Sequence, residues 1–259
     1  MIDAGFELRL RRVGRDGRFV IIPMDHGITV GPVRGLADTG ATVAAVAAGG
    51  ADAVVTHRGI VGQTLSAPPA LGRIVHVNGA SALTPDPDDK RLVCRIETAV
   101  AAGADAVSFH LNVGSAHEGR QLEHLASVVE DAHALGLPVL AMSYPRGPTA
   151  HEDDPEHVAH AVRVAAEVGA DLIKTAYPGN GFEAAVEAVD VPVLIAGGEP
   201  ADDLATLASV EAAVDAGAAG VSIGRTIFQH EDPQAMTAAV AAVVHDGESA
   251  DAALERHLG

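Results

Sequence analysis

The sequence predicts a single α/β domain over residues 1–259, in which eight parallel strands alternate with helices and close into a (β/α)8 TIM barrel. Three observations support this fold. The chain has 259 residues without a break in composition, a size typical of one barrel. Short Val/Ile-rich runs alternate with Ala-rich stretches along its length. The predicted helices repeatedly end in Gly-Ala-Asp, where glycine supplies the left-handed turn that ends a helix.

Eight apolar runs mark the strands. They are expected near residues 19–24, 52–57, 72–77, 104–110, 138–143, 170–175, 192–196 and 220–223. Such near-continuous apolar runs are typical of a parallel sheet buried on both faces. Residues 58–71 are too short and too rich in proline for a full helix, so we expect a loop with at most one helical turn. A doubly wound open sheet is the alternative, but it requires a reversal of strand order that a sequence does not display.

Composition narrows the function classes. The net charge of −18 argues against nucleic acid or an anionic membrane as a partner. No apolar run approaches the roughly 18 residues that span a bilayer. One cysteine, Cys94, excludes an internal disulfide and fits a reducing cytoplasm. The acid excess, with arginine in place of lysine, resembles proteins of salt-loving organisms.

Five arginines lie between Arg9 and Arg18. They could form a nucleic-acid-binding arm, but the acidic chain favours a short helix that closes the bottom of the domain or meets a neighbouring subunit.

Lysine is the rarest charged residue, with only Lys90 and Lys174 in the chain. Lys90 follows Asp-Pro-Asp-Asp and is expected at an exposed helix start. Lys174 lies in an apolar run with the pattern of a buried strand, where desolvation lowers the pKa of an amine. A neutral amine attacks ketones to form imines, which arginine cannot do. The alternative is a structural lysine that reaches from a strand end to a carboxylate.

Catalytic groups of barrels gather where the strands end. Polar residues or glycines stand at or just after the end of every predicted strand: Asp25, His26 and Gly27; His57 and Arg58; Asn78 and Gly79; His110 and Asn112; Tyr144, Pro145 and Arg146; Lys174, which strand six carries; Gly197 and Gly198; Gly224 and Arg225. The glycines after strands seven and eight, with Arg225, predict a phosphate site. Asp25 and Tyr144 are expected to flank Lys174 and to move protons.

A metal site is the main chemical alternative. His26, His57, His76 and His110 lie on or after successive strands, and a divalent ion could polarise a ketone. However, His76 could face the helices, and no carboxylate or cysteine joins the histidines at ligand spacing. A second histidine cluster, residues 151–160, is explained by Asp154 as a helix cap and Pro155 as the first helical residue. We therefore expect no metal and no cofactor.

Residues 25–36 (Asp-His-Gly-Ile-Thr-Val-Gly-Pro-Val-Arg-Gly-Leu) resemble the first-strand motif of the archaeal-type class I aldolases. Residues 144–147, Lys174-Thr175, Gly197-Gly198 and residues 224–230 continue the resemblance in order, from about residue 18 to the C-terminus. Within that superfamily, residues 107–115 and 142–147 favour the synthases that open an archaeal route to 3-dehydroquinate and the aromatic amino acids. The fructose-bisphosphate aldolases of this type often carry a tryptophan near the fourth strand, and this chain has none.

The resemblance implies a transaldolase-type enzyme that forms a Schiff base. Lys174 would form an imine with 6-deoxy-5-ketofructose 1-phosphate and pass a three-carbon unit to L-aspartate semialdehyde. Asp25 matches the family's proton acceptor and Tyr144 its proton donor. The family also implies a homo-oligomer. The positions that match its sugar-phosphate contacts are Asp25, His26, Gly27, Ile28, Thr29, Tyr144, Pro145, Arg146, Gly197, Gly198, Gly224 and Arg225.

Other readings of the same residues stay open. Arg58 and Arg146 are candidates for binding the carboxylate of the semialdehyde. A fructose-1,6-bisphosphate aldolase would use the same lysine and need a second cationic site. The remaining alternatives are a thiolase-like acyl transferase and a barrel that binds a sugar phosphate without turnover. A protein that only binds a sugar phosphate does not require a buried amine.

Overall fold

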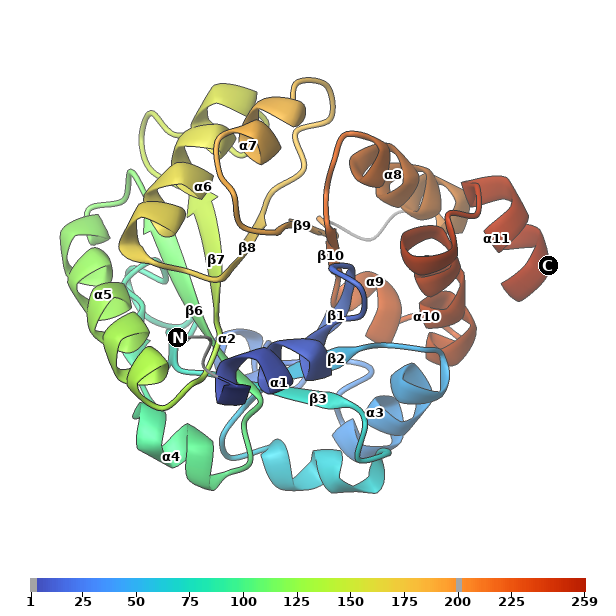
Figure 1. The fold of residues 1–259 in the computed structure, drawn as a ribbon, viewed down its shortest axis with the longest axis horizontal. Coiled ribbons are helices and arrows are strands. Elements are labelled where there is room, and N and C mark those ends of the chain that lie inside the picture. Colours follow the sequence, from blue (N-terminus) through green and yellow to red (C-terminus); the bar gives the residue numbers. More distant parts are fainter. Residues whose placement is uncertain (1–3, 199–201) are drawn as a thin grey trace.

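The computed structural model describes residues 4–198 and 202–259, whose strands form a closed parallel barrel inside a ring of helices (Figure 1). Around the barrel the strands follow the order β1-β10-β9-β8-β7-β6-β3-β2. This confirms the predicted fold, and every barrel strand lies within three residues of its predicted bounds. The strands are β1 (Phe19–Pro23), β2 (Ala53–His57), β3 (Gly72–His76), β6 (Ala106–Val113), β7 (Val139–Pro145), β8 (Leu172–Thr175), β9 (Val193–Ala196) and β10 (Gly220–Ser222).

Helices lie around the barrel and across its ends, and most of them bury the outward faces of the strands (Figure 1). They are α1 (Ala4–Val13), α2 (Gly27–Val30), α3 (Thr39–Ala48), α4 (Ile96–Ala101), α5 (Glu118–Ala134), α6 (Pro155–Val168), α7 (Glu183–Glu187), α8 (Asp203–Asp215), α9 (Arg225–Phe228), α10 (Pro233–Ala241) and α11 (Ala250–His257). A π-helical turn, Ala242–Asp246, continues α10. Among the described residues, no helix has the length and apolar character that a membrane crossing requires.

The repeated Gly-Ala-Asp sequence has a structural role. Asp52, Asp105 and Asp171 each stand just before a strand, and one carboxylate oxygen of each accepts a hydrogen bond from a backbone amide at the start of the preceding barrel strand. The amides are those of Val20, Arg73 and Val139, at 2.7, 2.9 and 2.8 Å. Neighbouring strands are therefore aligned at their first residues by a side chain as well as by the backbone, because the amides of Asp52, Asp105 and Asp171 donate in turn to the carbonyls of Val20, Arg73 and Val139.

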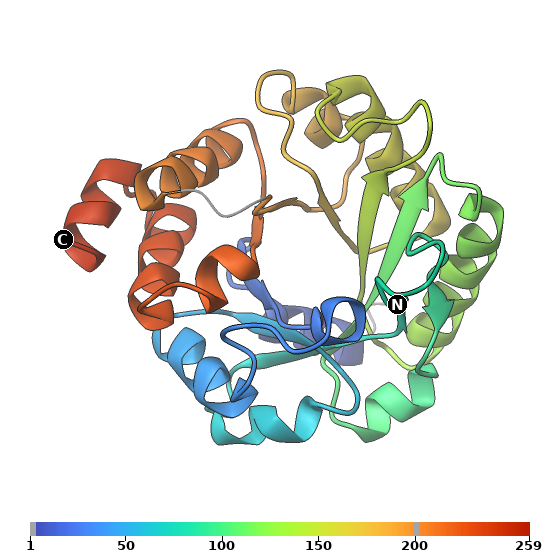
Figure 2. The ribbon, with the colours of Figure 1, turned by 180° about the vertical axis from the view of Figure 1, so that it is seen from behind.

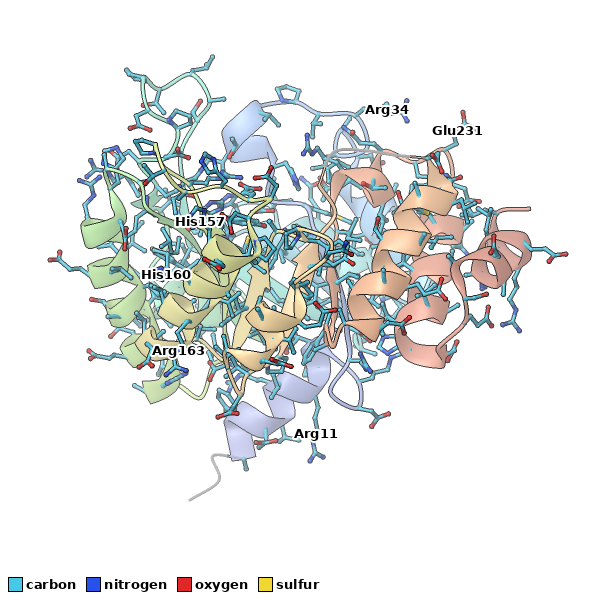
Figure 3. The ribbon with its side chains drawn as sticks, turned by 90° about the horizontal axis from the view of Figure 1, so that it is seen from above. Arg11, Arg34, His157, His160, Arg163 and Glu231 are labelled. Atoms are coloured by element: carbon cyan, nitrogen blue, oxygen red, sulfur yellow. The ribbon has the colours of Figure 1, made fainter. Side chains whose placement is uncertain are left out.

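Helix α1 closes the amino-terminal end of the barrel, as the arginine-rich start predicted. Arg12 Nε lies 2.5 Å from Asp105 Oδ1, and Arg15 Nε lies 2.9 Å from Asp52 Oδ1. Figure 3 shows α1 below the strands, with Arg11 pointing away from them. The arginines thus bind the same aspartates that align the strands.

The helix α6 begins as predicted. Asp154 caps it by accepting hydrogen bonds from the amides of Glu156 and His157, and Pro155 is its first residue. His160 is exposed on this helix and His157 is half-buried (Figure 3).

Two connections differ from the prediction. Residues 58–71 contain the 3-10 helix η1 (Val61–Ser66), which at about three residues per turn is two turns rather than one. Residues 78–92 contain a small antiparallel hairpin of β4 (Asn78–Gly79) and β5 (Arg91–Leu92), which the sequence analysis did not predict. Lys90 lies in this hairpin and not at a helix start, and its side chain is buried. The prediction for Lys90 was wrong because the hairpin folds back over the barrel.

Candidate active site

A cavity of about 550 Å³ opens at the carboxyl ends of the barrel strands, the end that faces the viewer in Figure 2. Most of the predicted site residues line it: Asp25, His26, Thr29, Tyr144, Arg146, Lys174, Gly197, Gly198, Gly224 and Arg225. Gly27 and Ile28 line a neighbouring cavity instead, together with Arg58. Of the described residues, Pro145 belongs to the wall of neither cavity. The barrel thus brings together residues that lie up to two hundred positions apart.

Lys174 is placed by β8, where it pairs in register with Met142 of β7 and Leu194 of β9. Its side chain is buried, and among the described residues it makes no hydrogen bond and no ion pair. Burial lowers the pKa of its amine from 10.5 to about 8, with Arg146 and Arg225 acting in the same direction and Asp25 opposing them. An appreciable fraction of the amine is therefore neutral near pH 8, and the neutral form is the nucleophile.

Asp25 follows β1 and points into the same cavity. His76 Nε2 lies 3.7 Å from one carboxylate oxygen, and His26 Nδ1 lies 3.8 Å from the other. Burial acts to raise the pKa of Asp25, but the surrounding His76, His26 and Lys174 outweigh it, and the pKa falls to about 2. Asp25 is therefore ionised at neutral pH and can accept a proton.

Tyr144 occupies the end of β7 and is buried between two cavity residues. Its ring centroid lies 5.2 Å from that of His110, and Arg146 Cζ lies 5.1 Å from the ring centroid on which it stacks. Burial raises the pKa of the Tyr144 hydroxyl well above its ordinary value. The phenol therefore keeps its proton across the physiological range and can donate it.

The loops after β9 and β10 form one end of the cavity. Arg225 Nη2 donates a hydrogen bond to the carbonyl of Gly198 at 3.4 Å. A Cβ atom at Gly224 would lie 2.7 Å from His26 Cε1, so only glycine fits there without a shift of that ring. Gly198 has a φ of 61°, in the left-handed region that favours glycine. The glycines thus leave the backbone accessible beside a guanidinium, an arrangement suited to a phosphate.

The four histidines proposed as metal ligands do not form a ligand set. His76 faces the barrel interior, where its Nδ1 lies 2.8 Å from Ser108 Oγ, and not the helices. His110 Nε2 is 2.7 Å from Asn112 Oδ1. Burial lowers the pKa of His76 to about 4, so it is neutral at pH 7. Within residues 4–198 and 202–259, no group of three or more His, Cys, Asp and Glu side chains could hold a metal ion.

The cavity also contains residues that the sequence analysis did not assign to it, chiefly Lys90 and Glu152. Glu152 Oε1 accepts a hydrogen bond from Arg146 Nε at 2.7 Å. The rarity of lysine singles out Lys90 as well as Lys174, but the acidic residues before Lys90 indicated an exposed position. Nothing in the local sequence of Glu152 distinguishes it from its acidic neighbours.

Three comparisons with known proteins agree with this geometry. Residues 19–230 match the DeoC/LacD family of aldolases. The chain is 55% identical over 258 residues to the 2-amino-3,7-dideoxy-D-threo-hept-6-ulosonate synthase of Halobacterium salinarum, covering 99% of this chain and 97% of that protein.

Among solved structures, an archaeal fructose 1,6-bisphosphate aldolase superposes with a TM-score of 0.87 at 34% identity, covering 93% of this chain and 100% of the aldolase. A second, with its catalytic lysine covalently bound to the carbinolamine intermediate of the substrate, superposes with a TM-score of 0.83 at 32% identity, covering 92% and 99% of the two chains.

Proposed function

Because this chain belongs to the DeoC/LacD family of aldolases, we propose that it is a transaldolase that exchanges aldehydes through an imine on Lys174. The observation that carries this proposal is a buried amine with a lowered pKa in one cavity with an ionised carboxylate, Asp25, and a protonated phenol, Tyr144. Imine chemistry needs a nucleophile, a proton acceptor and a proton donor, and these three side chains supply them.

The first half-reaction cleaves the donor, 6-deoxy-5-ketofructose 1-phosphate. The neutral amine of Lys174 attacks the methyl ketone, and the loss of water leaves a protonated imine. Asp25 accepts the proton of the hydroxyl on the adjoining fragment, and the carbon–carbon bond breaks. A phosphorylated three-carbon dicarbonyl leaves, and the electrons of the broken bond form an enamine on Lys174. The positive imine accepts these electrons, which is why the step needs a lysine.

The second half-reaction builds the product. The enamine carbon attacks the aldehyde of L-aspartate semialdehyde, and Tyr144 gives a proton to the new hydroxyl oxygen. The proton that Asp25 took up in the first half-reaction passes through solvent to Tyr144, which restores the carboxylate and the phenol. Water then hydrolyses the imine, frees Lys174 and releases 2-amino-3,7-dideoxy-D-threo-hept-6-ulosonate. The water lost in the first half-reaction is replaced in the second, and no electron enters or leaves. The reaction therefore balances without a redox cofactor, and we expect none.

The loops after β9 and β10 are proposed to bind the phosphate of the donor. Arg225 supplies a fixed positive charge, and the backbone at Gly198 and Gly224 allows close approach. His26 and Thr29 line the same cavity, and His26 lies beside both Asp25 and Gly224. Of the proposed sugar-phosphate contacts, Gly27, Ile28 and Pro145 have the least support, because they do not line this cavity.

Fructose-1,6-bisphosphate aldolase is the second candidate function. Arg146 lines the same cavity as Arg225 and could bind a second phosphate, and solved structures of such aldolases superpose on this chain. The name of the synthase from Halobacterium salinarum, to which this chain is 55% identical, supports the transaldolase instead.

A product assay separates the two functions. The enzyme would be incubated in high salt with 6-deoxy-5-ketofructose 1-phosphate and L-aspartate semialdehyde, and separately with fructose 1,6-bisphosphate. We expect the amino-heptulosonate from the first mixture and slow triose phosphate release from the second. Triose phosphate release that is faster than amino-heptulosonate synthesis would instead identify a fructose-bisphosphate aldolase.

We also propose that the protein acts in the cytoplasm as a homo-oligomer, with small molecules as its substrates. Its single cysteine supports the first point. Light scattering at several salt concentrations would measure the mass of the assembly, and a monomer at every concentration would contradict the second.

A further inference from the structure

His76 lies against Asp25, and no step of the proposed reaction uses it. It is the last residue of β3 and is 4% exposed. Its Nε2 lies 3.7 Å from Asp25 Oδ2. Asp25 lines the cavity that holds Lys174, whereas the described wall of that cavity does not include His76. His76 is therefore placed to act on the reaction through Asp25, and not by contact with a substrate.

The strand register fixes the ring of His76 from another side. Strands β3 and β6 pair in parallel and set His76 opposite Ser108. The two side chains contact each other, with His76 Nδ1 2.8 Å from Ser108 Oγ. Ser108 is fully buried. Because both residues belong to paired barrel strands, the position of the ring is built into the sheet.

The two neighbours of the ring determine which nitrogen carries its proton. A neutral imidazole has one N–H and one lone pair, and a serine hydroxyl can donate or accept. A proton on Nδ1 would leave the lone pair of Nε2 facing an ionised carboxylate, and two acceptors repel each other. When Ser108 donates to Nδ1, the proton is on Nε2 and faces Asp25. The surroundings therefore select the tautomer with Nε2–H.

Other titratable groups also surround Asp25. His26 Nδ1 lies 3.8 Å from the second carboxylate oxygen and has no hydrogen-bond partner among the described residues. The ring of His57 lies 5.2 Å from that of His76. The titratable groups coupled electrostatically to Asp25 or to His76 are His26, His57, Lys90, His110, Tyr144 and Lys174. Of the two histidines nearest to the carboxylate, His76 is the one whose ring a further hydrogen bond fixes.

We propose that His76 is a positioning residue, whose Nε2–H, directed by Ser108, keeps the carboxylate of Asp25 ionised and in place. The inference rests on the proposed function, in which Asp25 accepts a proton as the donor is cleaved. Burial alone would raise the pKa of Asp25, and His76 is the largest opposing influence. An N–H that faces the carboxylate also restrains its rotation, and a misplaced catalytic group slows a reaction strongly.

Substitution of His76 tests this role on the first half-reaction alone. Enzyme in excess is mixed with 6-deoxy-5-ketofructose 1-phosphate, and release of the phosphorylated three-carbon dicarbonyl is followed over a single turnover. At about pH 8, His76→Leu should slow this release about 10- to 100-fold. His76→Gln should recover part of the rate, because its amide can present an N–H near the place of Nε2. The borohydride-trapped adduct on Lys174 should not decrease, because His76 does not line the cavity.

Ser108→Ala tests whether Ser108 acts through the ring. The substitution removes one neutral hydrogen bond and should slow release about 2- to 10-fold. In a protein that already carries His76→Leu, it should have no further effect, because the ring that Ser108 directs is absent. Equal effects of Ser108→Ala in the two backgrounds would contradict the role of Ser108 in the inference.

The pH dependence separates positioning from a general loss of structure. The ratio of the His76→Leu rate to the wild-type rate cancels the titration of Lys174, which both proteins share. Without His76, burial is opposed by fewer groups, so the pKa of Asp25 rises and its carboxylate takes up a proton at a higher pH. Since Asp25 accepts a proton only when ionised, the ratio should fall between about pH 8 and about pH 4, measured directly after a jump in pH. A constant ratio would overturn the inference.

His245→Leu is the matched control. His245 Nε2 lies 2.9 Å from Asp52 Oδ2, and both side chains are buried. The pair has the same chemistry as His76 and Asp25, but Asp52 stands just before β2, at the opposite end of the barrel from the cavity. Assayed below its unfolding temperature, His245→Leu should match wild type in the rate of release and in its pH dependence.

Release at the wild-type rate in His76→Leu would overturn the inference and leave the proposed function intact. A loss of trapping on Lys174 that parallels the loss of release would also overturn it, because the whole site would then be disturbed. A wild-type enzyme that forms no adduct on Lys174, or that does not release the dicarbonyl, would overturn the proposed function itself.

Discussion

At the scale of single residues, burial sets the protonation states that the chemistry requires. The same desolvation lowers the pKa of Lys174 and raises that of Tyr144, because it disfavours the charged form of each group. The pKa of Asp25 is lowered despite its burial, because histidines and Lys174 surround its carboxylate. One cavity thus holds a partly neutral amine, a charged carboxylate and a neutral phenol at the same pH.

The lowered pKa of Lys174 makes a prediction about stability. In the folded state the amine releases its proton above about pH 8, while in the unfolded chain it holds the proton up to about 10.5. Between these values the unfolded state binds more protons, so the free energy of unfolding rises with pH. From pH 8 to 9.5, wild type should gain about 1 to 2 kcal/mol relative to Lys174→Met in urea unfolding. Parallel pH profiles for the two proteins would show that the amine has an ordinary pKa.

The two lysines show what single residues reveal in a sequence. Lys174 was predictable because its apolar neighbours form a strand pattern, and a strand in a barrel is buried. Lys90 follows Asp-Pro-Asp-Asp, which has the local pattern of an exposed helix start. Its burial depends on Asn112 and Gln121, more than twenty residues away, and no local pattern contains that contact.

At the scale of the elements, the aspartates just before the strands each contact a neighbouring strand and at least one basic side chain. Each one aligns the preceding barrel strand through a backbone amide, and Asp52 and Asp105 also bind arginines at or just after α1. The same carboxylates therefore fix the strand register and close the bottom of the barrel.

Asp105→Ala tests this role. The substitution leaves the Arg73 amide and the Arg12 guanidinium without their partner, and the free energy of unfolding should fall by about 2 to 3 kcal/mol. Asp131→Ala is the matched control, because Asp131 is an exposed residue of α5, and it should change stability by less than about 0.5 kcal/mol. Equal effects of the two substitutions in urea unfolding would refute the alignment role.

The regular elements were predictable and the connections were not. The strands recur with a fixed pattern of apolar residues, which constrains each one. Residues 58–71 and 78–92 have no such period, and they form η1 and the β4–β5 hairpin through contacts with the barrel. The Gly-Ala-Asp pattern was visible in the sequence, but the hydrogen bonds of its aspartates required the strand order.

At the scale of the whole molecule, the closed barrel follows from eight repeats of one strand–helix unit, and the net charge of −18 follows from 35 acidic and 17 basic residues. The charge has a physical cost, because like charges repel in the compact state. Salt screens this repulsion, since the Debye length falls from about 10 Å at 0.1 M to about 3 Å at 1 M.

The urea midpoint of unfolding should therefore rise between about 0.1 M and 1 M potassium chloride, the range over which screening becomes strong. Potassium sulfate at equal ionic strength should raise it at least as much. A rise in sulfate alone would indicate exclusion of the salt from the protein surface and not screening.

The most direct test of the central claim is borohydride trapping followed by peptide mass spectrometry. The protein is incubated in high salt with 6-deoxy-5-ketofructose 1-phosphate, reduced and digested, with fructose 1,6-bisphosphate in a parallel sample. We predict an adduct on the Lys174 peptide, stronger with the deoxy-diulose than with the bisphosphate, and none on the Lys90 peptide. The absence of an adduct with either sugar, or an adduct on Lys90 in place of Lys174, would contradict the imine mechanism proposed for this barrel.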